Sequence, residues 1–153
     1  MRQFTVYAPC DVDLDILWRV KNDFQTELRL AAEDLRNIIL ISDVELDDGL
    51  MRRRVVDCRL GYNPIPTPFR SLVKPENLRT RIESEWHVDR HDESHPCIMT
   101  MHLPHYAGEF LMSVNVLQWL DACGTEGVRN RIVTRVSIDI QAKGAVGTVA
   151  ERL

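Results

Sequence analysis

The chain lacks most of the short signals that assign a protein to a class at first sight. Its four cysteines stand far apart with no CxxC pair, so the zinc-ribbon and thioredoxin signatures are missing and reduced, mostly buried thiols are expected. No apolar run approaches the roughly 18 residues that a membrane helix needs. The start of the chain has neither the basic region nor the apolar segment of a signal peptide, so we expect a cytoplasmic protein.

Catalytic and nucleotide-binding motifs are missing as well. The sequence has no GxSxG, HExxH, P-loop or Rossmann spacing, and no Ser, His and Asp lie close enough to suggest a triad. This weakens the hydrolase and nucleotide-binding interpretations, although an enzyme assembled from scattered residues is still compatible with the sequence. The formal net charge of -4 argues against general affinity for nucleic acid, so no nucleic-acid partner is expected.

The composition is that of an ordinary folded domain. Of the 153 residues, 44% are hydrophobic and 27% are charged, which is close to the values of soluble globular proteins. A chain of this length buries roughly two thirds of its unfolded surface without disulfides or metal. No internal repeat is visible, and we expect residues 1–153 to form a single domain.

The first part of the sequence predicts a strand followed by two helices. Residues 2–8 alternate apolar and polar side chains and then meet Pro9, which predicts a first strand that ends there. Asp11 or Asp13 can cap the following helix. Apolar residues recur in it at helical spacing: Val12, Ile16, Leu17 and Val20, with Leu14 and Trp18 adjoining them. A second short helix is predicted from residue 24 to residue 32.

From residue 38 the periodicity becomes that of strands. Residues 37–60 predict a hairpin that turns at Asp47, Asp48 and Gly49, and the proline-rich residues 61–70 predict an ordered loop. Period-two patterns predict further strands at 81–89, 97–104, 109–120 and 131–140. We therefore predict an α+β fold, with an antiparallel sheet of six to seven strands and two short helices after the first strand.

Charge is distributed unevenly over the predicted hairpin and the region after it. Residues 31–48 hold six acids against one arginine, whereas residues 50–81 hold eight basic residues against two acids. Cross-strand pairing of the two arms is the simplest explanation. The alternative is a basic surface for an anionic headgroup or a membrane, with five candidate residues: Arg52, Arg53, Arg54, Arg70 and Lys74.

The predicted strands share one dry face that is rich in aliphatic and methionine side chains. The residues expected on it are Trp86, Met99, Met101, Phe110, Met112, Val114, Val136 and Ile138, with the polar Ser84, Gln118 and Thr134. Such a face suits a pocket for an apolar ligand, because binding cavities are mainly hydrophobic with a few placed polar groups, and thioethers adapt to irregular shapes. Plain core packing beneath the helices is the alternative explanation.

All five histidines lie within residues 86–106. Three of them are spaced by four residues, as metal ligands on a helix would be: His87, His91 and His95. Alternation and Pro96 instead predict a strand, a turn and a second strand. In that arrangement His87 lies on the outward face and His102 diagonally near it, which makes these two the weak candidates for a metal site. An ordinary polar surface is the preferred explanation, so no metal and no cofactor are expected.

Three stretches resemble the START-like helix-grip (SRPBCC) superfamily, which includes Bet v 1-like proteins and polyketide cyclases. The superfamily's first strand, small-Pro-acid corner and amphipathic helix are similar to TVYAPCDVDLDILWRVKNDF. The proline-bearing crossover of its VASt-like lipid-transfer branch is similar to RRRVVDCRLGYNPIPTPFRSLVKPENLRTRIESEW. The Gly-rich approach to its terminal helix resembles GAVGTVAERL.

The resemblance implies a strongly curved sheet around a hydrophobic cavity that a long C-terminal helix closes. This chain stops at Leu153, about where that helix begins, and three explanations stay open: a fragment, a sheet covered by a partner or a second copy, or a shortened fold. The Gly-rich loop of plant Bet v 1 proteins is absent between Leu60 and Phe69, which argues against a plant-hormone-like ligand.

The dry face and the resemblance together predict a non-catalytic module that binds or transfers a lipid or another hydrophobic small molecule. The first alternative is an enzyme of the cyclase or dehydratase kind, with three weak candidates for proton transfer: His105, Glu109 and Asn115. The second is an interaction protein whose open sheet forms a homodimer or accepts a partner helix. Peripheral contact with a membrane through the basic residues is compatible with lipid binding.

Overall fold

The computed structural model describes residues 2–31, 35–61, 79–106, 110–125 and 128–142. In some of these segments the backbone alone is described, namely at residues 103–106, 110–112, 123–125, 128–129 and 140–142. The elements follow the chain as β1 (Arg2–Cys10), α1 (Leu14–Asn22), α2 (Phe24–Ala31), β2 (Leu35–Leu46), the 3-10 turn η1 (Asp47–Gly49), β3 (Met51–Leu60), β4 (Arg79–His87), β5 (Cys97–Tyr106), β6 (Phe110–Thr125) and β7 (Val128–Ala142).

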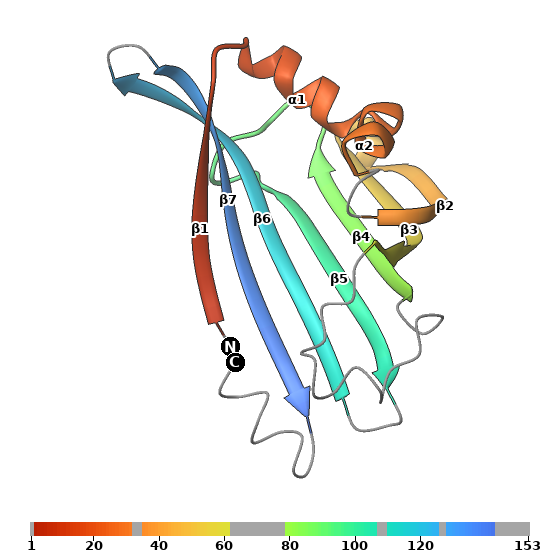
Figure 1. Cartoon of the computed structure of the whole chain (residues 1–153). Helices are drawn as coiled ribbons and strands as arrows, with labels where there is room; N and C mark the ends of the chain where they lie inside the picture. The colour runs from red at the N-terminus through yellow and green to blue at the C-terminus, as the bar shows by residue number, and fades with distance from the viewer. Residues whose placement is uncertain (1, 32–34, 62–78, 107–109, 126–127, 143–153) are drawn as a thin grey trace.

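Within these ranges, seven antiparallel strands form one open sheet in the order β1-β7-β6-β5-β4-β3-β2 (Figure 1). Both helices follow β1 in the chain, and Figure 1 shows them at one end of the sheet, near β2, β3 and β4. The long strands β5, β6 and β7 continue beyond the helices. The predicted α+β fold, with an antiparallel sheet and two helices after the first strand, is confirmed.

Two aspartates determine where the helices begin. Asp13 Oδ1 accepts hydrogen bonds from two backbone N–H groups of the first turn of α1, at 3.0 and 3.1 Å, so Asp13 rather than Asp11 is the cap. Asp23 stands between the helices, and its Oδ2 accepts from the backbone N–H of Thr26 at 2.9 Å. In the part of the chain that the structure describes, neither helix has the length and apolar character needed to cross a membrane.

The inward face of α1 differs from the one that helical spacing suggested. Trp18 is 2% exposed and packs against three residues of the sheet: Trp86, Cys97 and Leu120. Leu14 and Leu17 pack beside them. The other apolar residues of this region are exposed: Val12, Ile16 and Val20. Because a tryptophan has the largest apolar surface to remove from water, the orientation that buries Trp18 prevails over the one that buries Ile16 and Val20.

A second core cluster contains Val56, Cys58 and Ile82, with Phe24 of α2 packed against it. Burial raises the pKa of the Cys58 thiol to about 11 and also raises the pKa of the Cys97 thiol. Both thiols are therefore protonated at neutral pH. The expectation of free, buried cysteines is confirmed for these two residues, whereas Cys10 is half-buried.

The two edges of the sheet differ in regularity. β1 pairs with β7 without interruption from Arg2 to Cys10, so the prediction that the first strand ends at Pro9 was wrong. Pro9 is tolerated because an edge strand can turn a position without N–H away from the ladder. β2 is the other edge, and its pairing with β3 has two register shifts. Asn37, at the first shift, has a left-handed φ of 52°.

The turn between β2 and β3 lies where the sequence predicts it. Asp47, Asp48 and Gly49 have φ values of 50°, 55° and 87°, the left-handed region in which glycine and aspartate are favoured over bulky residues. The turn brings the acidic arm of the hairpin against the basic arm, with Glu45 opposite Arg52. The predicted hairpin is confirmed.

One aromatic residue is buried on the face of the sheet that points away from the helices. Trp119 lies opposite Val133 in the register, and it is only 6% exposed. The guanidinium carbon of Arg135 lies 5.0 Å from the centroid of the Trp119 ring. Arg135 Nη2 also donates to Glu93 Oε1 at 3.4 Å, which ties the turn after β4 to this face. The outer face thus has a small apolar layer of its own.

The position of Trp18 generates the first prediction. Trp18→Ala removes the buried side chain of α1. It also removes the hydrogen bond that Trp18 Nε1 donates to the His87 carbonyl oxygen at 2.9 Å. We expect the free energy of unfolding to fall by about 3 to 5 kcal/mol. Val20→Ala, on the exposed side of the same helix, is the control and is expected to cost less than about 1 kcal/mol. Urea denaturation of both variants measures the difference, and equal losses would contradict the assigned face.

Candidate functional site

The face of the sheet that meets the helices carries the residues predicted to bind a ligand. Directly paired residues of antiparallel strands lie on the same side of a sheet. The register aligns one continuous row across five strands: Ser84, Met99, Val116, Val136 and Phe4. A parallel row contains Ile82, Met101, Val114, Ile138 and Arg2. We refer to this side of the sheet, from Trp86 on β4 to Phe4 on β1, as the apolar face.

Exposure increases along the apolar face from the helices toward β1. Trp86 and Ser84 are buried under the helices, whereas Met99, Val116 and Val136 are half-buried. At the edge, the side chains of Phe4 and Val6 are 50% and 51% exposed. The helices lie at one end of the sheet (Figure 1), and the apolar face continues beyond them to β1.

The other predicted ligand-binding residues fall into the same register. Gln118 and Thr134 are paired across β6 and β7, and Gln118 Nε2 donates to Thr134 Oγ1 at 3.0 Å. These two polar side chains satisfy one another within the apolar face. Met112 pairs with Leu103 and Ile140, and Phe110 pairs with Ala142, but their side chains lie outside the described residues.

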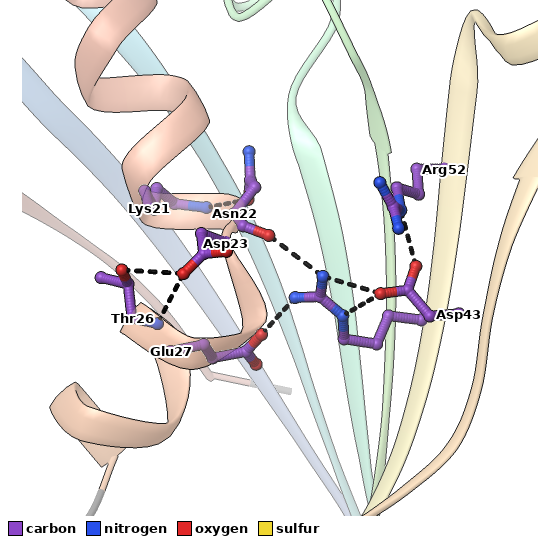
Figure 2. Close-up of polar contacts among 8 residues, drawn as sticks. Lys21, Asn22, Asp23, Thr26, Glu27, Asp43 and Arg52 are labelled. Atoms are coloured by element: carbon purple, nitrogen blue, oxygen red, sulfur yellow. Dashed lines mark hydrogen bonds and ion pairs between the residues drawn. The ribbon is translucent and has the colours of Figure 1, made fainter.

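Figure 2 shows polar side chains of the helices and of strands β2 and β3 joined by hydrogen bonds and ion pairs. Arg54 of β3 is 4% exposed, and its Nη1 donates to Glu27 Oε2 of α2 at 2.6 Å. Its Nε and Nη2 donate to Asp43 Oδ2 of β2 at 3.0 and 2.9 Å. Nη2 also reaches the Asn22 carbonyl oxygen at the end of α1, 3.1 Å away. One guanidinium thus connects both helices to two strands.

Aromatic rings complete the surroundings of this guanidinium. Its central carbon lies 5.1 Å from the centroid of Phe24 and 5.0 Å from that of Trp86, within the range of cation-π attraction. Burial alone would raise the pKa of Asp43, but the hydrogen bonds from Arg52 and Arg54 outweigh it, so the pKa of Asp43 is lowered. Asp43 is accordingly ionised, and the buried charges compensate one another.

Ion pairs involve three of the five residues of the predicted headgroup surface, which stays a prediction. Arg52 Nε donates to Asp43 Oδ1 at 2.6 Å, and Arg53 Nη2 donates to Glu83 Oε2 at 2.7 Å. Arg54 is buried, whereas Arg52 and Arg53 stay partly exposed but are each paired with a carboxylate. Cross-strand pairing, the simpler explanation of the charge pattern, is the one that the structure supports. Arg70 and Lys74 lie outside the described residues.

Lys21, near the end of α1, is a half-buried residue that sequence reasoning did not single out. Its Nζ donates to Asn22 Oδ1 at 3.0 Å and lies 4.8 Å from the centroid of the Trp18 ring. Burial lowers the pKa of Lys21, since desolvation disfavours the charged form. Asn22 Nδ2 is buried and has no hydrogen-bond partner among the described residues. Helical spacing alone could have placed Lys21 on the side of Trp18, three residues earlier.

His91 holds α1 against the turn after β4, and two other histidines make contacts within that turn. His91 Nε2 lies 2.9 Å from Asp15 Oδ1, and the His91 ring centroid is 5.9 Å from that of Trp18. His87 Nδ1 accepts from two backbone N–H groups of the turn, at 3.1 Å each. His95 Nδ1 lies 3.0 Å from Asp92 Oδ1. These contacts are those of a structured turn.

No metal site follows from this arrangement. His102 is opposite Arg81, six residues before His87 on the same strand, a separation of about 20 Å along β4. The two weak metal candidates are therefore not brought together. Among the residues that the structure describes, no group of three or more His, Cys, Asp and Glu side chains could hold a metal ion.

The candidates for proton transfer are not assembled either. Asn115 is opposite Thr100 and Ser137, and Thr100 Oγ1 donates to Asn115 Oδ1 at 3.1 Å. Its neighbours Val114 and Val116 belong to the apolar face, so Asn115 points to the opposite side, away from any ligand on that face. The side chain of His105 and the whole of Glu109 lie outside the described residues.

Comparison with known proteins found no similar protein. No protein-family model matches the chain, and no curated protein and no solved structure gives a match either.

The buried guanidinium generates the second prediction. Arg54→Ala leaves Asp43 and Glu27 without their buried partner, so we expect a loss of about 3 to 5 kcal/mol in the free energy of unfolding. Arg53→Ala removes the exposed ion pair with Glu83 and is expected to cost less than about 1 kcal/mol. Chemical denaturation of the two variants, which change adjacent residues, tests this. Similar losses in both would show that the buried network does not hold the helices.

Lys21 generates a prediction of pH dependence. Because its pKa is lowered in the folded protein, the unfolded chain binds more protons at pH values between that pKa and the ordinary value of about 10.4. The contribution of Lys21 to stability therefore rises with pH across this window.

Comparison with Lys21→Met measures that contribution. The free energy of unfolding of the wild type minus that of the variant should increase with pH in the alkaline range and level off above the ordinary lysine pKa. The raised thiol pKa of Cys58 acts in the opposite direction and cancels in the subtraction. Cys97 interacts electrostatically with Lys21, so its thiol keeps a contribution to the difference at the pH values where it ionises. Urea denaturation at several pH values gives the difference, and a constant difference would contradict the lowered pKa of Lys21.

Proposed function

We propose that this protein is a helix-grip module that binds a lipid or another hydrophobic small molecule on its apolar face. The proposal rests on one observation: an apolar surface with half-buried methionine and valine side chains continues from the helix-covered core to the exposed Phe4 and Val6. An apolar surface of this extent is costly in water unless something covers it.

The chemistry of the apolar face suits a ligand more than a rigid core. Met99 and Met101 lie on β5, at the centre of the sheet, and thioether side chains adapt their shape to different apolar molecules. Polar groups on this face are few, and Gln118 and Thr134 already bond to one another. The face therefore offers apolar contact with little directional hydrogen bonding, which favours a long or flexible hydrocarbon over a polar metabolite.

The order of elements supports the helix-grip part of the proposal. A strand followed by two helices and an antiparallel sheet is the order that the START-like resemblance implies. In that arrangement α1 and α2 would form one wall of the binding site, with Trp18 and Trp86 at its closed end. The open end would lie toward β1 and β7.

The proposal predicts the effect of filling the apolar face. Val136→Trp places a bulky ring in the middle of the row and is expected to weaken binding of a fluorescent fatty-acid analogue roughly tenfold, about 1.4 kcal/mol. Ile98→Trp is the control, because Ile98 is exposed on the opposite face, one residue from Met99. Fluorescence titration compares the two, with circular dichroism as the test of folding.

Native mass spectrometry of freshly purified protein gives an independent test. A bound species that adds mass to the native protein and disappears on denaturation supports the ligand-binding proposal and identifies the ligand. Equal affinity of wild type and Val136→Trp for the analogue, together with no bound species, would exclude binding at this face.

The second candidate function is that of an interaction protein that forms a homodimer through β1. Phe4, Val6 and Tyr7 are all at least half exposed on this edge strand, so both faces of the edge carry apolar side chains. Two copies could pair their β1 strands and cover these residues. An unliganded dimer in the native mass spectrum would favour this candidate over ligand binding.

A further inference from the structure

Three arginines form a straight row across the outer face of the sheet, the face opposite the helices. Arg36 of β2 is directly opposite Arg59 of β3, and Arg59 is directly opposite Arg79 of β4. Residues in direct register point to the same side, with Cα atoms about 4.5 to 5.5 Å apart. Arg36 and Arg79 are exposed, and Arg59 is half-buried. We call these three residues the arginine row.

The arginine row is unfavourable for folding. Like charges placed directly opposite one another on adjacent strands destabilise a sheet, and here this occurs at two successive pairs. Elsewhere in the same sheet arginines are matched with carboxylates. The matched residues are Arg52, Arg53, Arg54, Arg81, Arg131 and Arg135. The arginine row differs from these six residues, because its members face one another instead of carboxylates.

The carboxylate of β3 that lies closest in sequence to Arg59 is held by another arginine. Asp57 lies two residues before Arg59, and Arg81 holds both of its oxygens, with Nε to Oδ1 at 2.8 Å and Nη2 to Oδ2 at 3.0 Å. That bidentate contact lowers the pKa of Asp57, with a smaller contribution from Arg79. His102 is the residue opposite Arg81 on β5. Among the described residues, the structure records no ion pair between a carboxylate and the row.

We propose that the arginine row binds a phosphate-bearing anion, supplied either by a soluble phosphoester or by the headgroup of a membrane lipid. A guanidinium presents two parallel N–H donors that match a phosphate in geometry and charge. The row extends over two strand spacings, about 10 Å, which is long enough for a group with more than one phosphate. A bound anion would also relieve the repulsion that the row creates.

This site is separate from the apolar face. The row lies on the opposite side of the sheet and involves β2, β3 and β4, whereas the exposed part of the apolar face lies at β1 and β7. Anion binding can consequently be present or absent independently of a hydrophobic ligand. Failure of one proposal does not affect the other.

Isothermal titration calorimetry with inorganic pyrophosphate tests the shared chemistry. At constant ionic strength, we expect Arg59→Gln to weaken pyrophosphate binding roughly tenfold, because it removes a charged hydrogen-bond donor at the centre of the row. Arg53→Gln is the matched control: it removes one positive charge from the same face and the same strand, but from a residue already paired with Glu83. The control should bind pyrophosphate as the wild type does.

Stability gives a readout that a merely structural role of Arg59 would not produce. Without pyrophosphate, Arg59→Gln is expected to raise the melting temperature, since it removes the repulsion with Arg36 and Arg79. With pyrophosphate, the wild type should gain more stability than the variant. Arg79→Gln, at the exposed start of β4, is the second variant should Arg59→Gln fold poorly, and the same changes are expected of it.

Vesicle co-sedimentation distinguishes the two sources of phosphate. Binding to phosphatidylcholine vesicles that contain phosphatidic acid, lost in Arg59→Gln and retained in Arg53→Gln, would support a lipid headgroup. Pyrophosphate binding without vesicle binding would support a soluble phosphoester. The proposal is overturned if neither probe binds, or if Arg53→Gln loses as much affinity as Arg59→Gln, because the effect would then be one of overall charge.

Discussion

The buried guanidinium of Arg54 is the interaction on which the arrangement of helices and sheet depends. It bonds at once to the end of α1, to α2 and to β2, and it lies against Phe24 and Trp86. Taking a charge out of water costs several kcal/mol, which only a full set of partners offsets. A shift of either helix would leave part of this charge unpaired. The network therefore specifies one docking position for the helices, whatever its net contribution to stability.

That fixed docking divides the sheet into regions with different chemistry. Under the helices the side chains are closely packed around Trp18, and further along the same face they become progressively exposed. The outer face carries ion pairs, a small layer at Trp119 and the arginine row. Since alternate residues of each strand belong to opposite faces, a single strand such as β3 contributes Arg54 to the core and Arg59 to the surface. The proposed apolar site and the proposed anion site therefore lie on opposite faces of the sheet and toward opposite edges.

Period-two patterning predicted the strands and their faces well, because alternation is a local property that burial on one side imposes. It also assigns Asn115 to the side opposite Val114 and Val116, so that residue was a poor candidate for chemistry on the apolar face. Pro9 was misjudged because tolerance of a proline depends on whether the strand is at an edge, which only the strand order reveals. Register is likewise invisible in the sequence: Arg36 and Arg59 are neighbours only after a hairpin with two register shifts. The ion pair of Arg52 with Asp43, in contrast, could be predicted in kind, because the acidic and basic arms of the hairpin indicated cross-strand pairing.

The unequal edges of the sheet limit how copies of this chain can associate. β1 offers a regular, uninterrupted ladder, whereas the two shifts and the left-handed Asn37 bend β2 away from the geometry that a further strand requires. Strand addition is therefore favoured at one side only. An assembly that grows through both edges forms fibres, but one that uses a single self-complementary edge closes after two copies. If copies of this chain associate by strand addition, the irregular β2 favours a closed pair over a growing fibre.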